Sequence, residues 1–509
     1  MFPNNSELIS AYPLQSKVFG HRFTPNQSLY EYILEFLLVA ISRKTVGNNE
    51  EEALFPMNPD VYDKEIKYFP EGKVGLKRFI FFNKSKLEGK FEMDTMAYEL
   101  CVKYLKDRIE IETAREFIDE DYVISLFQNL LYGFNAVIQN RSWFAQSLLP
   151  ICKEAIFPEM MGMKKDRNGK YDNSFDEEFI DNVDTKFEKN RYNFMARGGE
   201  VYYLHVLKAL NDYPKYSHEI EQGFNNLLNQ FNEFSLLSNF IESVWEEGEG
   251  EGFKQPEINK TLGVIPDGFN NREEKTLVEL KNILTSTMHP FEKIDILSYG
   301  IILQIITMSY QQAKFASGQK LGCWIFDINC NRGTSHPEVK KLAQNAFSKY
   351  EEVYLKALYN NVEGNIKEGK GGKLRSEQET IDEAVNNSLK VYRKLGKRIG
   401  IIRPVNEKGM RFTLNETILK FLVTSLIAPG TKMTLDRFLY KIHDHFRIVI
   451  GQYEYKKEIL EGNVETLSDV SFLDKNKEDF HIMLKECGFL RELSDSTSIV
   501  ENPYKEVTL

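Results

Sequence analysis

Hydrophobic residues recur at helical spacing over most of the chain, and polar or turn-forming residues separate the successive apolar segments. Apolar positions three and four residues apart predict amphipathic helices. Clusters of glycine, proline and asparagine mark the breaks between them. The pattern predicts helices over 29–43, 94–111, 121–137, 142–155, 201–211, 216–232, 234–246, 336–360, 376–395, 415–427, 434–446 and 475–487, and two more within 272–317.

Strand signals are few. Residues 60–92 are short aromatic segments punctuated by turns, which predicts β-rich or irregular structure. One buried strand is expected within 320–333, and two strands should flank a turn at 406–409. Two short apolar runs within 489–504 predict a hairpin. The predicted fold class is mainly α with minor β (α+β), in a multi-domain helical protein.

Chain length and two glycine-rich stretches predict three domains. A chain of 509 residues exceeds the size of an ordinary single core. Residues 242–257 combine acids, glycines and a proline, while 360–375 are rich in glycine and lysine without periodicity, so both are candidate linkers. The predicted units are an N-terminal α+β domain (1–250), a helical middle domain with one strand (258–362) and a winged-helix-like C-terminal domain (376–509).

The C-terminal segment has the order helix, helix, helix, hairpin, which is typical of a winged helix. In a DNA-binding winged helix, the last helix presents basic side chains outward. Here Lys475, Lys477 and Lys485 are offset by three acidic residues of the same helix. This near-neutral helix favours contact with a protein, although contact with DNA stays open.

Composition restricts the possible classes of function. The net charge of −10, from 65 basic and 75 acidic residues, excludes coating of nucleic acid by bulk charge but allows a local basic patch. Five widely spaced cysteines suit a reducing cytosol and argue against a disulfide scaffold. The apolar segments 29–42 and 294–310 are too short to span a membrane, and the N-terminus does not resemble a signal peptide. We therefore expect a cytoplasmic protein without membrane contact.

A local basic patch lies between residues 390 and 411. Its basic residues are Lys390, Arg393, Lys394, Lys397, Arg398, Arg403, Lys408 and Arg411. Glu407 is the one acid in this range, so eight minus one leaves seven net positive charges. Such a patch can neutralise phosphates and bind DNA with salt-sensitive affinity. The alternative is a solvated helix face that pairs with the acids at 377–383.

The segment NFMARGGEVYYLHVL (193–207) predicts a turn that leads into a buried helix. Gly198 and Gly199 permit positive φ or a close backbone approach, and Glu200 would lie in the first helical turn, where the dipole favours an anion. His205 is expected to be solvated or lightly packed. Because Arg197 is left without a structural role, Arg197 and Glu200 are candidates for an anion or ligand site.

Arg332 is a third candidate for an anion site. It lies in the turn DINCNRGTSHPE (327–338), where Ser335 is expected to cap a helix whose backbone N–H groups could bind an anion. The turn lacks the spacing of a phosphate-binding loop. An ordinary strand-to-helix connection is therefore the alternative.

Signals for metals and catalysis are weak. Asp267, Glu279 and Lys281 loosely match the carboxylates and lysine of a Mg²⁺-dependent nuclease, but the segment around Glu279 scans equally well as a helix. Cys323 and Cys330 are too widely spaced for an ordinary zinc pair. We predict no metal and no cofactor, while catalytic residues stay unknown and a metal-dependent nuclease or other hydrolase is kept as the alternative.

Three segments carry a resemblance: RFTLNETILKFLVTSLIAPGTKMTLDRFLYKIHDHFRIVIG, RSWFAQSLLPICKEAIFPE and ARGGEVYYLH. They resemble uncharacterised accessory proteins of prokaryotic antiphage defence operons, which often include a HerA/FtsK-like ATPase. The resemblance implies a cytoplasmic bacterial protein that works with partners on DNA, and it assigns no catalytic residue. We therefore expect a non-enzymatic subunit of a DNA-acting complex that binds DNA, partner proteins or both, and a pure protein-binding scaffold is a further alternative.

Overall fold

The structure is a computed structural model of the chain. It describes residues 2–3, 13–23, 27–84, 92–111, 118–137, 146–158, 197–248, 260–267, 272–319, 322–366, 375–405, 408–494 and 497–507. Most of the two predicted linkers, at 249–257 and 367–374, and the centre of the predicted hairpin turn, at 495–496, lie outside these residues.

The described part of the chain is mainly helical, with small sheets, which confirms the prediction of a mainly α protein with minor β. The α-helices are α1 (Pro13–Phe19), α2 (Glu31–Ile41), α3 (Val74–Phe81), α4 (Glu92–Arg108), α5 (Glu120–Tyr132), α6 (Gly198–Asp212), α7 (Ser217–Leu228), α8 (Asn232–Gly248), α9 (Glu273–Leu284), α10 (Pro290–Ala316), α11 (Pro337–Tyr359), α12 (Glu377–Asn386), α13 (Leu389–Arg398), α14 (Glu416–Leu426), α15 (Leu435–Phe446), α16 (Gln452–Leu460) and α17 (Phe472–Glu486). None of the helices within the described ranges is long and apolar enough to cross a membrane.

The strands of the described ranges form four small sheets. They are β1 (Arg43–Val46), β2 (Asn49–Glu51), β3 (Ile66–Phe69), β4 (Lys260–Thr261), β5 (Trp324–Ile325), β6 (Ile402–Arg403), β7 (Arg411–Phe412), β8 (Lys432–Thr434), β9 (Ile448–Val449), β10 (Leu490–Ser494) and β11 (Thr497–Glu501). One sheet has the order β2-β1-β3-β4 and another the order β10-β11-β8, and both are antiparallel. The pair β5–β9 is parallel and the pair β6–β7 is antiparallel.

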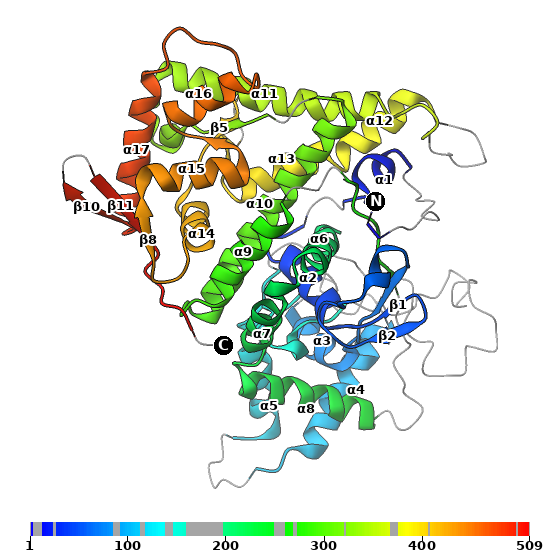
Figure 1. Ribbon diagram of the computed structural model, residues 1–509. Coiled ribbons are helices and arrows are strands. Elements are labelled where there is room, and N and C mark those ends of the chain that lie inside the picture. The colour runs from blue at the N-terminus through cyan, green and yellow to red at the C-terminus, as the bar shows by residue number, and fades with distance from the viewer. Residues whose placement is uncertain are drawn as a thin grey trace.

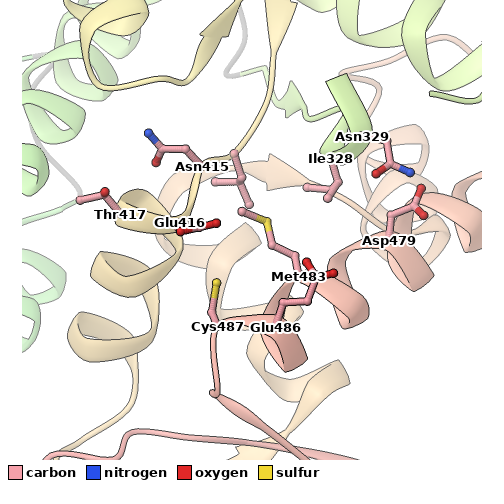
Figure 2. Close-up of a pocket in the computed structure, with 10 residues that line it drawn as sticks. Ile328, Asn329, Asn415, Glu416, Thr417, Asp479, Met483, Glu486 and Cys487 are labelled. Atoms are coloured by element: carbon pink, nitrogen blue, oxygen red, sulfur yellow. The ribbon is translucent and has the colours of Figure 1, made fainter. Parts of the chain in front are cut away.

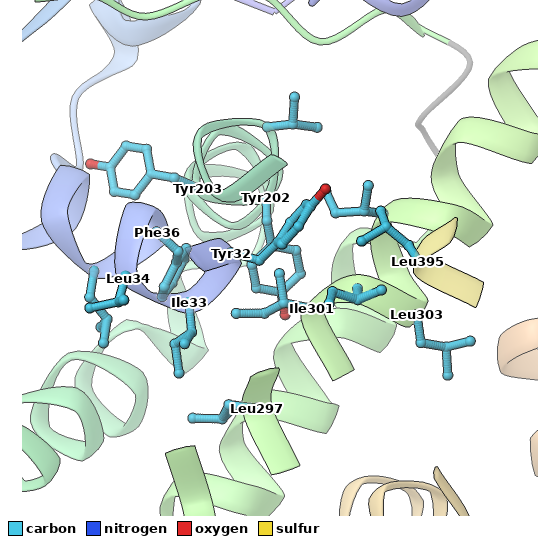
Figure 3. Packing of buried hydrophobic residues seen from close by; sticks show 14 of the residues in the cluster. Tyr32, Ile33, Leu34, Phe36, Tyr202, Tyr203, Leu297, Ile301, Leu303 and Leu395 are labelled. Atoms are coloured by element: carbon cyan, nitrogen blue, oxygen red, sulfur yellow. The ribbon is translucent and has the colours of Figure 1, made fainter. Parts of the chain in front are cut away.

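The long helix α10 runs through the middle of the molecule (Figure 1). On one side it contacts α2 and α6 from the N-terminal half, and on the other it contacts α11 and α14. Its apolar residues are buried almost all round, so it supplies core to both sides. Figure 3 shows the centre of this core, where Tyr32, Ile33 and Phe36 of α2 lie beside α10 and its side chains Leu297 and Ile301.

The helices α2 and α6 pack unusually closely, because glycines begin α6. A Cβ on Gly199 would lie 2.4 Å from the carbonyl oxygen of Tyr32 and 2.5 Å from the backbone nitrogen of Phe36. A Cβ on Gly198 would lie 2.2 Å from Cε1 of the Tyr32 ring. The predicted need for close backbone approach is thus confirmed, whereas the positive φ of 65° belongs to Arg197.

Three parts of the predicted helix pattern are wrong. Residues 74–81 form the helix α3, all of whose residues are buried, within a segment that was predicted to be β-rich or irregular. Residues 146–155 are not α-helical, because Leu148 forms a β-bridge with Asn135 and only a short 3-10 turn, η4 (Lys153–Ala155), follows Pro150. The predicted helix 376–395 is two helices, α12 and α13, separated at Asn387 and Ser388.

The main hydrophobic core is continuous from Phe2 to Val500 and includes residues of all three predicted domains. A smaller cluster lies around Val449, Tyr455 and Leu473. The contacts of α9 with both α6 and α14 cross the expected boundary between the N-terminal and later segments. The division into three domains remains a prediction.

Candidate functional site

The helix α13 carries a cationic face. Lys390, Lys394 and Lys397 are spaced four and three residues apart, so they lie on the same side of the helix. Lys390 and Lys394 are exposed and Lys397 is half-buried, while Leu389, Tyr392 and other apolar residues of α13 face the core. No acidic residue occurs within α13. We call these three residues the lysine face.

Two arginines of the predicted patch are held by the protein itself. Arg393 forms an ion pair with Glu351 of α11. Nη1 of Arg398 donates a hydrogen bond to the backbone carbonyl of Gln27, just before α2. These contacts fix α13 against its neighbours, although the side chain of Arg398 stays exposed beside Lys390 and Lys394.

The remaining basic residues lie on or near the β6–β7 hairpin. Arg411 is buried, and its Nε lies 2.6 Å from Oδ2 of Asp327, so its charge is neutralised inside the protein. Lys408 is exposed and Arg403 is half-buried. Of the eight basic residues predicted to contact DNA, Lys390, Lys394, Arg398 and Lys408 are exposed, and Arg398 is also bonded to the backbone of Gln27.

The arginine of the Arg-Gly-Gly-Glu segment meets a carboxylate of the protein. Nη1 of Arg197 lies 3.0 Å from Oε2 of Glu200, and Nζ of Lys260 lies 3.2 Å from the same oxygen. The backbone N–H of Gly263 donates to the other oxygen of Glu200, at 3.0 Å. Glu200 is fully buried, so its charge is compensated within the protein.

A second buried carboxylate, Glu35 of α2, accepts hydrogen bonds from the start of α6. Its two oxygens accept from the backbone N–H groups of Arg197 at 3.0 Å and Gly199 at 2.9 Å. Burial, together with repulsion from Glu200, raises the pKa of Glu35 to about 7. Burial opposes ionisation of Glu200 as well, but Lys260 and Arg197 outweigh it and hold the pKa of Glu200 below its ordinary value.

His205 is buried, so the expectation of a solvated histidine is wrong. Its Nε2 lies 2.9 Å from Oγ1 of Thr276 on α9. Burial lowers the pKa of His205 to about 4, against the opposing influence of Glu273. As the helical spacing predicted, Glu200 and His205 do not meet: Glu200 pairs with Lys260 of β4, whereas His205 bonds to α9.

The turn that contains Arg332 is capped by its own side chains. Arg332 ends the 3-10 helix η9 (Ile328–Arg332), and the position of its side chain lies outside the described part of the structure. The N-cap of α11 is His336, not Ser335, and its Nδ1 accepts a hydrogen bond from the backbone N–H of Glu338. The backbone N–H of Glu338, one of those expected to be free for an anion at this helix start, therefore already donates to His336.

Glu279 and Lys281, two of the three residues that loosely match a Mg²⁺-dependent nuclease, bond to different partners. Glu279 is buried against Nη2 of Arg272 at 3.1 Å and Nδ1 of His445 at 2.9 Å. Lys281 pairs instead with Glu219 of α7, at 2.7 Å. Within the described ranges, no group of three or more histidine, cysteine, aspartate or glutamate residues could hold a metal ion.

The outer side of α17 is compensated in charge. Lys475 pairs with Glu478 at 2.8 Å, and Lys485 pairs with Glu492 of β10 at 3.0 Å. Figure 2 shows a pocket of about 320 Å³ between η9, the start of α14 and α17. Glu416, Asp479 and Glu486 are among the residues that line this pocket, so its charge is unfavourable for a phosphate.

Sequence reasoning missed Glu35 and Lys260 as partners of Glu200. The available signal was the presence of two acids, Glu31 and Glu35, in an otherwise apolar run that forms α2. Buried charges need a partner, so such acids predict a cationic or N–H-rich neighbour without saying which one.

Comparison with known proteins gave no match. No protein-family model, no curated protein and no solved structure is similar to this chain.

Proposed function

We propose that the chain is a non-enzymatic, DNA-binding subunit of a prokaryotic complex, and that the lysine face of α13 contacts DNA phosphates. The observation that carries the proposal is the spacing of Lys390, Lys394 and Lys397 along one side of a helix without acids. Such a stripe can follow a phosphate backbone even on a chain whose net charge is −10. Lys408 on the neighbouring hairpin would extend the contact.

The C-terminal region would contribute a protein-docking unit of winged-helix type. The elements α14, β8, α15, α17, β10 and β11 follow the order of a winged helix, and β11 pairs with both β10 and β8. The elements β9 and α16 would then be an insertion before the last helix. Because the lysines of α17 are paired with acids and the adjacent pocket is acidic, a basic segment of a partner protein suits this surface better than DNA does.

The setting that we propose is an antiphage defence complex in the cytoplasm, with a HerA/FtsK-like ATPase as a candidate partner. It rests on the resemblance of three sequence segments to accessory proteins of such operons. The Mg²⁺-dependent nuclease is less favoured, because Glu279 and Lys281 are engaged with different partners.

Retention of duplex DNA in an electrophoretic mobility assay tests the proposal. The variant Lys390→Glu/Lys394→Glu/Lys397→Glu should retain less duplex DNA than the unaltered chain at low salt. The control Lys103→Glu/Lys432→Glu/Lys456→Glu alters three exposed lysines elsewhere and changes the net charge by the same amount. Equal retention by the two variants would remove the lysine face from the proposal.

A further inference from the structure

A cavity of about 400 Å³ lies between α2 and α13, beside the lysine face. Its apolar wall is formed by Val391, Leu395 and Val405, together with the ring of Tyr32. This volume falls within the range of roughly 300–1,000 Å³ that is common for sites of small ligands. The cavity can therefore hold a flat organic group and not only an ion.

The cationic wall of the same cavity is supplied by Lys394, Lys397 and Arg398. Arg398 uses Nη1 to bond the carbonyl of Gln27, and its charge still adds to that of the two lysines. A ligand in the cavity would thus meet aliphatic side chains on one side and positive charge on the other. An anionic group attached to an apolar body fits this distribution.

The hydroxyl of Tyr32, which lines this cavity, is buried and has no hydrogen-bond partner among the described residues. Buried hydroxyl groups are nearly always paired, so an unpaired one at a cavity wall indicates a site for an external donor or acceptor. Figure 3 shows the Tyr32 side chain extending from α2 toward Leu395 of α13. Gly198 permits this position, since a Cβ there would collide with the Tyr32 ring.

We propose that this cavity binds a nucleotide, with the base against Val391, Leu395 and Val405 and the phosphate near Lys394 and Lys397. A polar edge of the base would pair with the Tyr32 hydroxyl. An alkyl chain cannot supply that hydrogen bond, and inorganic phosphate cannot fill the apolar wall. This inference rests on the proposed function in one respect: the nucleotide is assigned to DNA because the chain is proposed to bind DNA.

Two sources could supply this ligand: an unstacked nucleotide of a single strand and a free nucleotide. Bases in a duplex are stacked and paired, so an intact duplex cannot place one in the cavity without paying for unstacking. Single-stranded DNA and free deoxynucleotides should therefore depend on Tyr32, whereas retention of duplex DNA should depend on the lysine face alone.

Binding of deoxyadenosine 5′-monophosphate, measured by isothermal titration calorimetry, tests the site directly. Tyr32→Phe removes only a hydroxyl that has no partner within the described part of the chain, so the fold should persist. We expect this variant to weaken binding by about 3- to 10-fold, the effect of one lost hydrogen bond. The matched control Tyr453→Phe, at an exposed tyrosine of α16, should bind as the unaltered chain does.

Parallel titrations separate the possible outcomes. Lys397→Gln should weaken binding of the monophosphate but not of deoxyadenosine, which has no phosphate. If Tyr32→Phe also weakens binding of a single-stranded oligonucleotide, the ligand of the cavity is a nucleotide of a DNA strand. Nucleotide binding that is absent, or unchanged by Tyr32→Phe, would overturn the cavity site while duplex retention still reports on the proposed function. A third outcome is that the chain retains neither duplex nor single-stranded DNA, while Tyr32→Phe still weakens nucleotide binding. This outcome would support a site for a free nucleotide and overturn DNA binding.

Discussion

The backbone N–H of Gly199, at the start of α6, donates a hydrogen bond of 2.9 Å to the carboxylate of Glu35 on α2. This bond explains why two glycines follow Arg197. Only a residue without a side chain lets the start of α6 approach α2 closely enough for Glu35 to reach its backbone N–H groups. The Arg-Gly-Gly-Glu segment therefore joins two buried helices, and the anion that Arg197 meets is Glu200.

The first prediction concerns this helix contact. Gly199→Ala should lower the free energy of unfolding by about 1–3 kcal/mol, because the new methyl group would collide with the backbone of α2. Urea denaturation measures the change. In the control Gly322→Ala, the closest atom to the new methyl group is the flexible end of Lys314, which can move, so a smaller loss is expected. Equal losses in the two variants would contradict the close-packing account.

A second prediction concerns the buried pair of Lys260 and Glu200. Lys260→Met should cost roughly 3–5 kcal/mol of stability, since it removes one of two cations from a fully buried carboxylate. Adding Glu200→Gln should cost less than the sum of the single changes, because the uncompensated charge is then absent. Additive losses in this double-mutant cycle would show that the pair is not coupled. The exposed pair Lys475–Glu478 is the control, and Lys475→Met should change stability little.

His205 gives a prediction for pH dependence. Its pKa is about 4 in the folded chain and ordinarily 6.5, so between these values the unfolded chain binds more protons. The contribution of His205 to stability must then fall as the pH falls through this window. From about pH 7 to about pH 5, the His205 contribution lost should be about 2 kcal/mol.

The comparison of the unaltered chain with His205→Gln isolates that contribution. Glu35, whose raised pKa of about 7 makes stability rise as the pH falls, titrates in both proteins and cancels in the difference. Urea denaturation at several pH values should show a shallower acid-side loss in His205→Gln. Parallel stability curves for the two proteins would mean that His205 is not held neutral by burial.

Much of the helical fold could be predicted because the signals are local. The helices α2, α9 and α10 follow directly from apolar spacing and from the break before Pro290. The helix α3 was missed, because the turn-forming residues Pro70 and Gly72 directly precede it and its segment was predicted to be β-rich or irregular. Residues 146–155 are not helical, because Leu148 forms a β-bridge with Asn135, and this tertiary contact outweighs their helical pattern.

The candidate site could also be predicted only where its residues are close together in the sequence. The lysine face could be predicted because three cations lie at helical spacing within eight residues. The burial of Arg411 could not be predicted, because its partner Asp327 lies 84 residues away in the sequence. Tyr32 and Leu395 meet at one cavity although most of the chain separates them, so no local pattern could have indicated a ligand site there.

The salt dependence of duplex DNA binding tests the central claim most directly. Each phosphate neutralised by a lysine contributes about 0.9 to the slope of the logarithm of the binding constant against the logarithm of salt concentration. Lys390→Glu/Lys394→Glu/Lys397→Glu should therefore lower the magnitude of the slope by about 2.7 or more, relative to the chain altered at Lys103, Lys432 and Lys456. Identical slopes and affinities for these two variants, or the absence of duplex binding by the unaltered chain at low salt, would contradict DNA binding through α13.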